Sequence, residues 1–279
     1  MDRQVDYNFP KTGIHRHVVE YIRNMPDLQG KTVLDIPCGD GRTSYELKKK
    51  GANLVALDLF PDFIKLDNVS AEYADLGETL PIDSDSVDYI ICQEGIEHIP
   101  NQLNALQEFN RVLKNGGTLI ITTPNNSHVR ARVSHFLLET DLWKRMPPTE
   151  IDGVWFAGNE ESKLYFGHLF LLGVQHFQSL ITFSGFKVNR RIKTDLSGSS
   201  LIMGIATYPL FLTFTIFSYF SYRKKNPHIE KNKKRRILWS RVKLNLSPLT
   251  LFHKHIFWEV RKTKDLDKIS AELKLMQRN

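Results

Sequence analysis

A strand, a glycine-containing turn, a helix and a second strand follow one another in residues 31–58, and this order constrains the fold more than any other feature of the chain. The apolar run KTVLD enters the turn IPCGDG, and the amphipathic segment RTSYELKKK ends at Gly51 before the second apolar run, NLVALD. Two strands joined through a helix form a parallel, right-handed βαβ unit. The sequence therefore predicts an α/β sheet that binds its ligand beyond the carboxyl ends of its strands.

Strands and helices continue to alternate after this unit. The expected elements are the strand 86–93 (SVDYIICQ), the helix 102–113 (QLNALQEFNRVL), the strand 118–125 (TLIITTPN), the helix 174–183 (VQHFQSLITF) and the strand 186–192 (FKVNRRI). Gly185 separates the last two, since a glycine commonly ends a helix. This alternation predicts a doubly wound sheet.

The cysteines, the N-terminus and the charge indicate a cytoplasmic protein. Cys38 and Cys92 are the two cysteines of the chain, and neither belongs to a CxxC pair, which argues against a disulfide framework and against a zinc knuckle. Residues 1–13 contain no apolar core of the kind that a secretion signal needs. The net charge of +7 is concentrated in residues 223–236, which hold eight Lys or Arg and one acid.

The turn after the first strand indicates which ligand the sheet would bind. Asp35-Ile-Pro-Cys-Gly-Asp-Gly41 lacks the GxGxxG pattern of nicotinamide dehydrogenases. It resembles motif I of the class I S-adenosylmethionine-dependent methyltransferases (type 11/12-like), D/E-x-G-x-G-x-G, with Pro37 at the first glycine of the pattern. LPIDSDSVDYIICQ and FNRVLKNGGTLIITTPN resemble the family's fourth strand and the helix, turn and strand that follow it, so the resemblance covers about residues 25–190.

The resemblance implies a Rossmann-like sheet of seven strands in which the seventh strand runs antiparallel beside the sixth. Residues 251–262 (LFHKHIFWEVRK) have the β-type, partly alternating character of that seventh strand, and residues 186–192 would be its partner. We therefore predict a methyltransferase domain made of residues 1–195 and 250–279. The apolar and basic insertion before the last strand would be residues 196–249.

The resemblance also implies a binding site for S-adenosylmethionine. Asp58, at the end of the second strand, would accept hydrogen bonds from the ribose hydroxyls, and Asp75 would lie beside the adenine. Taken alone, an aspartate at a strand end such as Asp58 is usually a helix cap or turn residue, and Asp75 lies in a sequence that suits a turn equally well. The glycine turn before Asp58 and the strand signature after it favour the cofactor role. The residues assigned to the cofactor are Asp35, Pro37, Cys38, Gly39, Gly41, Asp58, Leu59, Asp75, Leu76 and Gln93. The two cysteines are expected to be packing residues rather than nucleophiles.

A second group of polar residues follows the strand 86–93. Glu94, Glu97 and His98 would share one face if a helix began there. This E-x-x-E-H resembles the metal site of ubiquinone-biosynthesis O-methyltransferases and of enzymes that 2'-O-methylate small RNAs. His168, in the context GHLF, resembles the further histidine of the second group.

The resemblance therefore implies a Mg²⁺, Mn²⁺ or Fe²⁺ site made of Glu94, Glu97, His98 and His168. The candidate catalytic residues are His98, His168 and Glu94. The alternatives are helix-capping residues without a metal, and a histidine that acts as a plain general base.

Residues 196–222 contain no charged residue, and 201–222 are apolar and rich in aromatic side chains. Their length permits a membrane span, but Pro209 is expected to interrupt it, and the return of the chain to the sheet puts both ends on one side of a bilayer. We therefore predict a re-entrant or in-plane membrane contact through residues 201–236. A buried hairpin, a dimer interface, a solvated basic loop and an RNA-binding segment are the alternatives.

Together these features predict an S-adenosylmethionine-dependent O-methyltransferase, assisted by a metal, at the inner face of the cell membrane. Its acceptor would be a hydroxyl of a membrane-associated sugar, glycan or glycolipid precursor, an expectation that a loose resemblance to polysaccharide-cluster methyltransferases supports. The alternatives are a quinone-precursor O-methyltransferase, an RNA 2'-O-methyltransferase, and a non-catalytic scaffold that keeps the fold. Nucleic acid is the less favoured partner because it leaves the apolar insertion without a role.

Overall fold

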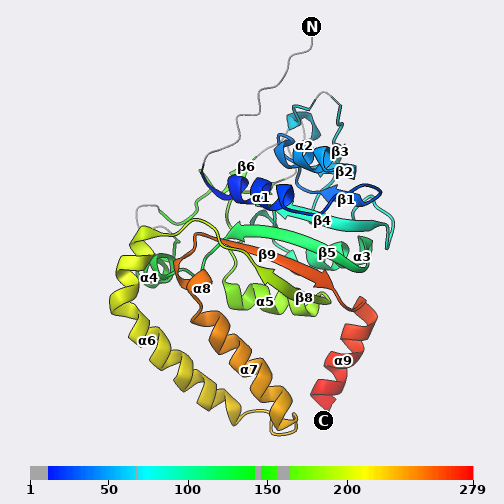
Figure 1. The fold of residues 1–279 in the computed structure, drawn as a ribbon. Helices are drawn as coiled ribbons and strands as arrows, with labels where there is room; N and C mark the ends of the chain where they lie inside the picture. The colour runs from blue at the N-terminus through cyan, green and yellow to red at the C-terminus, as the bar shows by residue number, and fades with distance from the viewer. Residues whose placement is uncertain (1–11, 67, 142–145, 156–163, 279) are drawn as a thin grey trace.

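The computed structural model describes residues 12–66, 68–141, 146–155 and 164–278, and its centre is one sheet of seven strands (Figure 1). The strands of this sheet are β1 (Thr32–Asp35), β2 (Asn53–Asp58), β3 (Glu72–Tyr73), β4 (Val87–Gln93), β5 (Leu113–Pro124), β8 (Phe186–Arg191) and β9 (His255–Lys262). Their order is β3-β2-β1-β4-β5-β9-β8. A separate pair, β6 (Val154–Trp155) and β7 (Tyr165–Phe166), lies outside this sheet.

The last strand of the chain lies inside the sheet rather than at its edge. β9 is antiparallel to β5 on one side and to β8 on the other, whereas β1 to β5 are mutually parallel. The prediction of a doubly wound, Rossmann-like sheet of seven strands with an antiparallel seventh strand is confirmed.

Each central strand sends alternate side chains to two separate cores, as the pleat of a strand requires. In β1, Leu34 belongs to the larger core and its neighbour Val33 to the smaller one. In β9, Trp258 belongs to the larger core and its neighbour Phe257 to the smaller one. A sheet buried on both faces explains the continuous apolar runs in the sequence.

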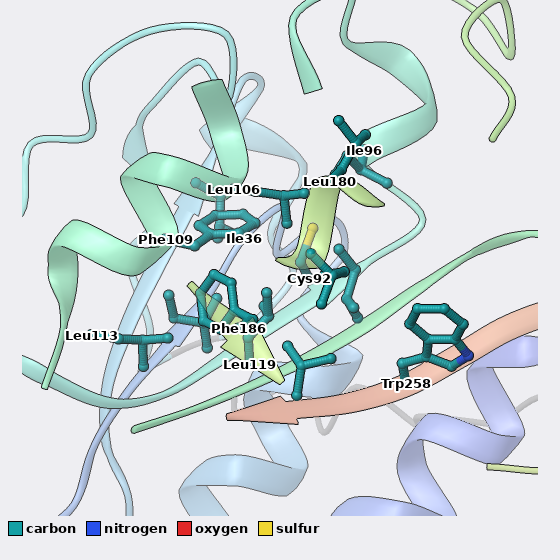
Figure 2. Close-up of a cluster of buried hydrophobic side chains, with 14 of the residues drawn as sticks. Ile36, Cys92, Ile96, Leu106, Phe109, Leu113, Leu119, Leu180, Phe186 and Trp258 are labelled. Carbon is teal, nitrogen blue, oxygen red and sulfur yellow. The ribbon is translucent and has the colours of Figure 1, made fainter. Parts of the chain in front are cut away.

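Helices cover both faces of the sheet. The larger core, part of which Figure 2 shows, contains side chains of α3 (Gln102–Val112) and α5 (Val174–Phe183), among them Phe109 and Leu180. The smaller core contains side chains of α1 (Ile14–Arg23) and α2 (Arg42–Lys49). The remaining described helices are α4 (Val129–Leu138), α6 (Gly198–Arg223), α7 (Lys231–Asn245), α8 (Pro248–Phe252) and α9 (Leu266–Arg278), with the short 3₁₀ helices η1 (Pro61–Phe63) and η2 (Ile96–His98).

The segment between β8 and β9 forms a helical hairpin. α6 and α7 project side by side from the rest of the molecule (Figure 1), and the rings of Tyr219 and Trp239 meet between them with centroids 5.5 Å apart. The side chain of Asn245 donates a hydrogen bond to Thr215 Oγ1 at 2.7 Å. The division of the chain into a domain of residues 1–195 and 250–279 and an insertion of 196–249 stays a prediction.

The expectation that Pro209 interrupts the apolar segment is wrong. α6 is a continuous helix of 26 residues with Pro209 inside it. A proline removes one intrahelical hydrogen bond, and the bonds on either side of it keep the helix intact. Among the described residues, α6 is the one helix long and apolar enough to cross a membrane, and 11% of its most apolar window is buried. This exposure excludes the alternative of a buried core hairpin.

A glycine fixes the junction between α5 and β8. Gly185 has φ 83°, and a Cβ atom there would lie 2.3 Å from the carbonyl oxygen of Lys264. The side-chain amide of Asn110, on α3, donates hydrogen bonds to the carbonyl oxygens of Ser184 and Lys264 at 2.8 and 2.9 Å. These two bonds stabilise the same junction.

Replacing this glycine should destabilise the whole fold. We expect Gly185→Ala to lower the free energy of unfolding by about 2 kcal/mol or more, because both the backbone conformation and the space disfavour a Cβ atom. Urea denaturation would measure the effect. Gly198→Ala is the matched control, since a Cβ atom at Gly198 meets nothing within 4 Å, and its unfolding free energy should change by less than about 0.5 kcal/mol. Equal effects of the two substitutions would contradict this explanation.

Candidate functional site

A cavity of about 440 Å³ opens at the carboxyl ends of β1, β2 and β4, where an open α/β sheet binds its ligands. Five of the residues that the sequence assigns to the cofactor line this cavity, namely Pro37, Asp58, Leu59, Asp75 and Leu76. Phe60, Ile99 and Tyr165 add apolar surface to its walls. A mostly apolar cavity whose lining also contains the carboxylates of Asp58, Asp75, Glu78 and Glu94 suits a planar base joined to a ribose.

Asp58 joins the glycine turn to the end of β2. Its Oδ2 accepts a hydrogen bond from the backbone N–H of Gly39 at 2.8 Å, and its Oδ1 accepts one from the N–H of Phe60 at 2.8 Å. A carboxylate has about four lone-pair positions, so each oxygen can accept a further hydrogen bond. Asp58 can therefore hold the turn and accept hydroxyl hydrogens from a ligand at the same time.

The other five predicted cofactor residues do not line the cavity and lie beneath it or in the glycine turn. They are Asp35, Cys38, Gly39, Gly41 and Gln93. Gly41 begins α2 with φ 88°, and a Cβ atom there would lie 2.9 Å from Ile64 and Leu66. Only a glycine fits this approach without displacing neighbours.

The buried polar residues beneath the cavity bond to the protein itself. Asp35 Oδ2 accepts a hydrogen bond from Ser44 Oγ at 2.6 Å, and Gln93 Oε1 accepts one from Thr43 Oγ1 at 3.2 Å. Burial raises the pKa of Asp35 to about 7, although the Ser44 hydrogen bond opposes this shift. Burial also raises the pKa of the Cys38 thiol to about 12, which leaves it without nucleophilic character at neutral pH.

Glu97, His98 and His168 form a second polar group beside the cavity. Each offers one ligand atom, and these three atoms lie within 4.8 Å of one another. The rings of the two histidines stack edge to face with centroids 4.9 Å apart. The structure therefore brings together three of the four predicted metal ligands.

Glu97 is the buried member of this group. Its Oε2 accepts a hydrogen bond from Thr123 Oγ1 at 3.0 Å, while its Oε1 is buried without a hydrogen-bond partner. Burial, and then the charge of Glu94, raise the pKa of Glu97 well above its ordinary value of 4.5. A cation would satisfy the orphan oxygen and favour the charged carboxylate.

The histidines also suit a metal. His98 Nδ1 lies 2.8 Å from the carbonyl oxygen of Phe166, to which only an N–H can donate. A neutral imidazole that donates from Nδ1 carries its lone pair on Nε2, which is the arrangement common in metal-ligating histidines. One carboxylate and two imidazoles thus fit a divalent cation of the Mn²⁺ or Fe²⁺ type.

Glu94 does not join this group, so the expected single helix face is wrong. Glu94 has φ 50° and precedes only the short 3₁₀ turn η2, while the next α-helix begins at Gln102. Its Oε1 accepts a hydrogen bond from Thr122 Oγ1 at 2.9 Å, and its Oε2 lies 3.6 Å from His255 Nε2. Burial raises the pKa of Glu94 to about 7. Glu94 lines the main cavity instead.

Three further residues of the site, His255, Thr122 and Thr123, were not predicted from the sequence. His255 is the first residue of β9 and is paired with Pro124 at the end of β5. The expected pairing of residues 251–262 with residues 186–192 does not by itself place His255 next to β5. The two threonines end the apolar run of β5, where two adjacent polar residues are a recognisable signal.

Comparisons with known proteins find methyltransferases. Residues 34–121 match the methyltransferase domain family Methyltransf_11. A ubiquinone biosynthesis O-methyltransferase of Xanthomonas oryzae pv. oryzae is 30% identical over 118 residues, which are 39% of this chain and 49% of that protein. The chain thus spans about half the length of the curated relatives it matches.

Solved structures show the same fold at low identity. The YcgJ protein of Bacillus subtilis has a TM-score of 0.53 at 15% identity, covering 90% of this chain and all of that one. A proposed S-adenosylmethionine-dependent methyltransferase of Listeria monocytogenes has a TM-score of 0.51 at 13% identity, covering 89% of this chain and 96% of that one. These two similarities concern the fold alone.

The buried carboxyl of Asp35 should make the stability of the protein depend on pH. Its pKa is about 7 in the folded protein and 3.8 ordinarily, so the folded state keeps a proton that the unfolded state loses. Stability from this residue is present below about pH 4 and is lost as pH rises to about 7. Asp35→Asn removes the titration, so the loss of unfolding free energy between pH 5 and pH 8 should shrink by up to about 3 kcal/mol. Identical losses in guanidinium unfolding of both proteins would contradict the shift.

Proposed function

We propose that this chain, whose domain and fold belong to the class I S-adenosylmethionine-dependent methyltransferases, transfers the sulfonium methyl group to a hydroxyl oxygen. The observation that carries the proposal is the cavity at the strand ends, whose wall contains Asp58, the last residue of β2, which accepts a hydrogen bond from Gly39 of the glycine turn. In the transfer, the hydroxyl oxygen forms a bond to the methyl carbon while the carbon–sulfur bond breaks. The electron pair stays on sulfur, which becomes a neutral thioether, and the hydroxyl proton leaves to a base.

At neutral pH the reaction needs a group that lowers the pKa of the acceptor hydroxyl and a base that takes its proton, and residues beside the cavity can supply both. Glu97, His98 and His168 would hold a divalent cation, as their spacing and the orphan oxygen of Glu97 support. Such a cation, when bound, orients the acceptor hydroxyl and lowers its pKa. Glu94 faces the main cavity with a pKa of about 7, so its carboxylate can take up a proton at neutral pH.

The proposed acceptor is a hydroxyl of a membrane-associated sugar, glycan or glycolipid precursor. α6 and α7 support this acceptor, because an exposed apolar helix next to a basic segment suits an enzyme whose substrate is anchored in a lipid layer. A quinone precursor is the second candidate, favoured by the relatives named ubiquinone biosynthesis O-methyltransferase. Transfer of radiolabelled methyl from S-adenosylmethionine into glycolipid or into a prenylated catechol separates these two acceptors.

Two further alternatives are weaker. An RNA 2'-O-methyltransferase would use the same candidate metal ligands, but it gives α6 no role. A scaffold without catalysis would have no need of the carboxylates that line the cavity, and it would bind no S-adenosylmethionine.

The hairpin would attach the protein to the cytoplasmic face of the membrane. α6 exposes large apolar side chains along its length, among them Ile205 at 83% and Phe217 at 70% exposure. The basic residues that follow would face anionic headgroups; they are Arg223, Lys224, Lys225, Lys231, Lys233, Lys234, Arg235 and Arg236. A helix that is apolar all round is stable only in a core or in lipid, and part of α6 faces neither α4, α7 nor α8. We place α6 in the plane of the membrane surface, with these basic side chains at the headgroups.

Removal of a metal ligand should weaken binding of a divalent ion in solution. We expect Glu97→Gln and His168→Ala to reduce Mn²⁺ affinity tenfold or more, because each substitution removes one of three protein ligands. Titration followed by electron paramagnetic resonance of free Mn²⁺ measures this directly, without an assay of activity. His176→Ala, which changes an exposed histidine of α5, is the control. Wild-type protein that binds no Mn²⁺ would rule out the metal part of the proposal.

Attachment to lipid should depend on α6 and on anionic headgroups. We expect the protein to sediment with vesicles of phosphatidylcholine and phosphatidylglycerol and to bind vesicles of phosphatidylcholine alone about tenfold more weakly. Ile205→Glu with Phe217→Glu should reduce binding to the anionic vesicles at least tenfold, because two apolar side chains can no longer enter the interface. Leu275→Glu changes a side chain of α9 that is 64% exposed and should leave vesicle binding unchanged. If all three proteins sediment alike, membrane docking by α6 is wrong.

A further inference from the structure

A second cavity lies on the other side of the histidine pair. Its volume is about 370 Å³, and its polar lining consists of Asn126, His135, Glu139, Thr140, Asp141, Asp152 and His168. His168 lines this second cavity, whereas His98 lines the first. The ring centroids of these two histidines are 4.9 Å apart, so the group Glu97, His98 and His168 stands between the two cavities.

We propose that this second cavity is the acceptor subsite, and that it takes an uncharged, hydroxyl-rich headgroup attached to an apolar chain. The proposal rests on the proposed function, because it places the methyl donor in the first cavity. An acceptor seated in the second cavity would present one hydroxyl at His168, beside the buried, unpartnered Oε1 of Glu97. The rest of the headgroup would remain among the polar side chains.

The chemistry of the lining selects hydroxyl donors. Three carboxylates, those of Glu139, Asp141 and Asp152, line the cavity, and a carboxylate only accepts hydrogen bonds when ionised. His135 Nε2 lies 2.7 Å from Asn126 Oδ1, so it donates there, and the Asn126 amide is held in one orientation. Neighbouring hydroxyls of a sugar ring are the donors that complement such a set.

The same lining disfavours the other acceptor classes. A phosphate or an RNA backbone would bring negative charge against three carboxylates. A flat aromatic precursor has fewer hydroxyls than a sugar ring, so it would displace water from these carboxylates and return fewer hydrogen bonds, which costs affinity. The cavity therefore distinguishes a sugar from both the RNA and the quinone alternatives.

The rim of the cavity supplies a place for an apolar chain. His135 and Glu139 both line the cavity, and the residues between them, Phe136, Leu137 and Leu138, are exposed. Phe136 has 89% of its surface exposed, which is unfavourable in water unless something covers it. An apolar chain that leaves the cavity at this rim would cover it.

α4 connects this rim to the hairpin. Arg132, on α4, donates a hydrogen bond to Asn245 Oδ1 of α7 at 2.8 Å, and its guanidinium lies 5.0 Å from the ring centroid of Phe211 on α6. The backbone N–H of Arg130 donates to Ser200 Oγ at 3.1 Å. The first turn of α4 is therefore fixed to the element that we place at the lipid surface, and the same short helix carries the rim of the cavity at its other end. A lipid-anchored headgroup could then reach the cavity without leaving the bilayer.

Ligand-observed NMR titration with soluble probes tests this subsite. The probes are the n-octyl glycosides of glucose, galactose and mannose below their micelle concentrations, the matching methyl glycosides, octyl phosphate and 4-octylcatechol, each added to protein saturated with S-adenosylhomocysteine. We expect at least one octyl glycoside to bind tenfold more tightly than octyl phosphate, 4-octylcatechol and its own methyl glycoside. The double variant Glu139→Gln, Asp141→Asn should weaken that glycoside tenfold or more. Phe136→Ser should weaken the octyl glycoside and leave the methyl glycoside unchanged.

The controls separate failure of the subsite from failure of the proposed function. Asp267→Asn, on α9 at the opposite end of the sheet, should change neither glycoside nor S-adenosylhomocysteine affinity, and the subsite variants should keep S-adenosylhomocysteine affinity within twofold. If S-adenosylhomocysteine binds but no glycoside does, or if octyl phosphate or 4-octylcatechol binds more tightly, the subsite proposal is overturned and the proposed methyl transfer stands. Binding of glycosides that the double variant leaves unchanged also overturns it. Protein that binds no S-adenosylhomocysteine overturns the proposed function itself.

Discussion

The antiparallel pairing of β9 between β5 and β8 is the constraint on which the rest of this structure depends. β8 ends at the edge of the sheet where the parallel strands have their carboxyl ends, and β9 begins at that edge, with His255 opposite Pro124. The segment between them therefore leaves and re-enters the fold beside the candidate site. This explains why a hairpin remote in sequence from the glycine turn packs on α4 and contributes to the surroundings of the site.

Burial of carboxyl groups is the second constraint. Asp35, Glu94 and Glu97 are all buried or nearly so, and burial raises the pKa of each. A charged carboxylate in such surroundings needs a donor, a cation or a proton. One oxygen of each carboxyl accepts a hydrogen bond from a threonine or serine hydroxyl. Asp35 and Glu97 each keep a second buried oxygen without a partner, and of these two it is Glu97 that lies beside two imidazoles, which is the structural reason for placing a cation between the two cavities.

Local sequence was sufficient for much of the fold and for part of the site. The positions of the strand ends and the roles of Gly41 and Gly185 can be predicted from periodicity and from turn chemistry, because both depend on only a few neighbouring residues. The conformation of Glu94 cannot, because its positive φ and the short 3₁₀ turn after it replace the helix that spacing alone would predict there. The continuity of α6 through Pro209, the partnership of Glu94 with His255 and the second cavity likewise depend on tertiary packing. The predicted cofactor residues that lie beneath the first cavity show the same limit, since a motif identifies a turn but not which of its side chains face the ligand.

The central claim is that the first cavity binds S-adenosylmethionine through the carboxylate of Asp58, at the end of β2. Isothermal titration calorimetry of S-adenosylhomocysteine tests it most directly, with wild-type protein and with Asp58→Ala whose unfolding midpoint has been checked. The account predicts one binding site in the wild type, and an affinity at least about tenfold lower in a variant that remains folded, because hydrogen bonds to a charged group are lost. Wild-type protein that gives no binding heat at any temperature tested, or a folded variant that binds as tightly as the wild type, would contradict it.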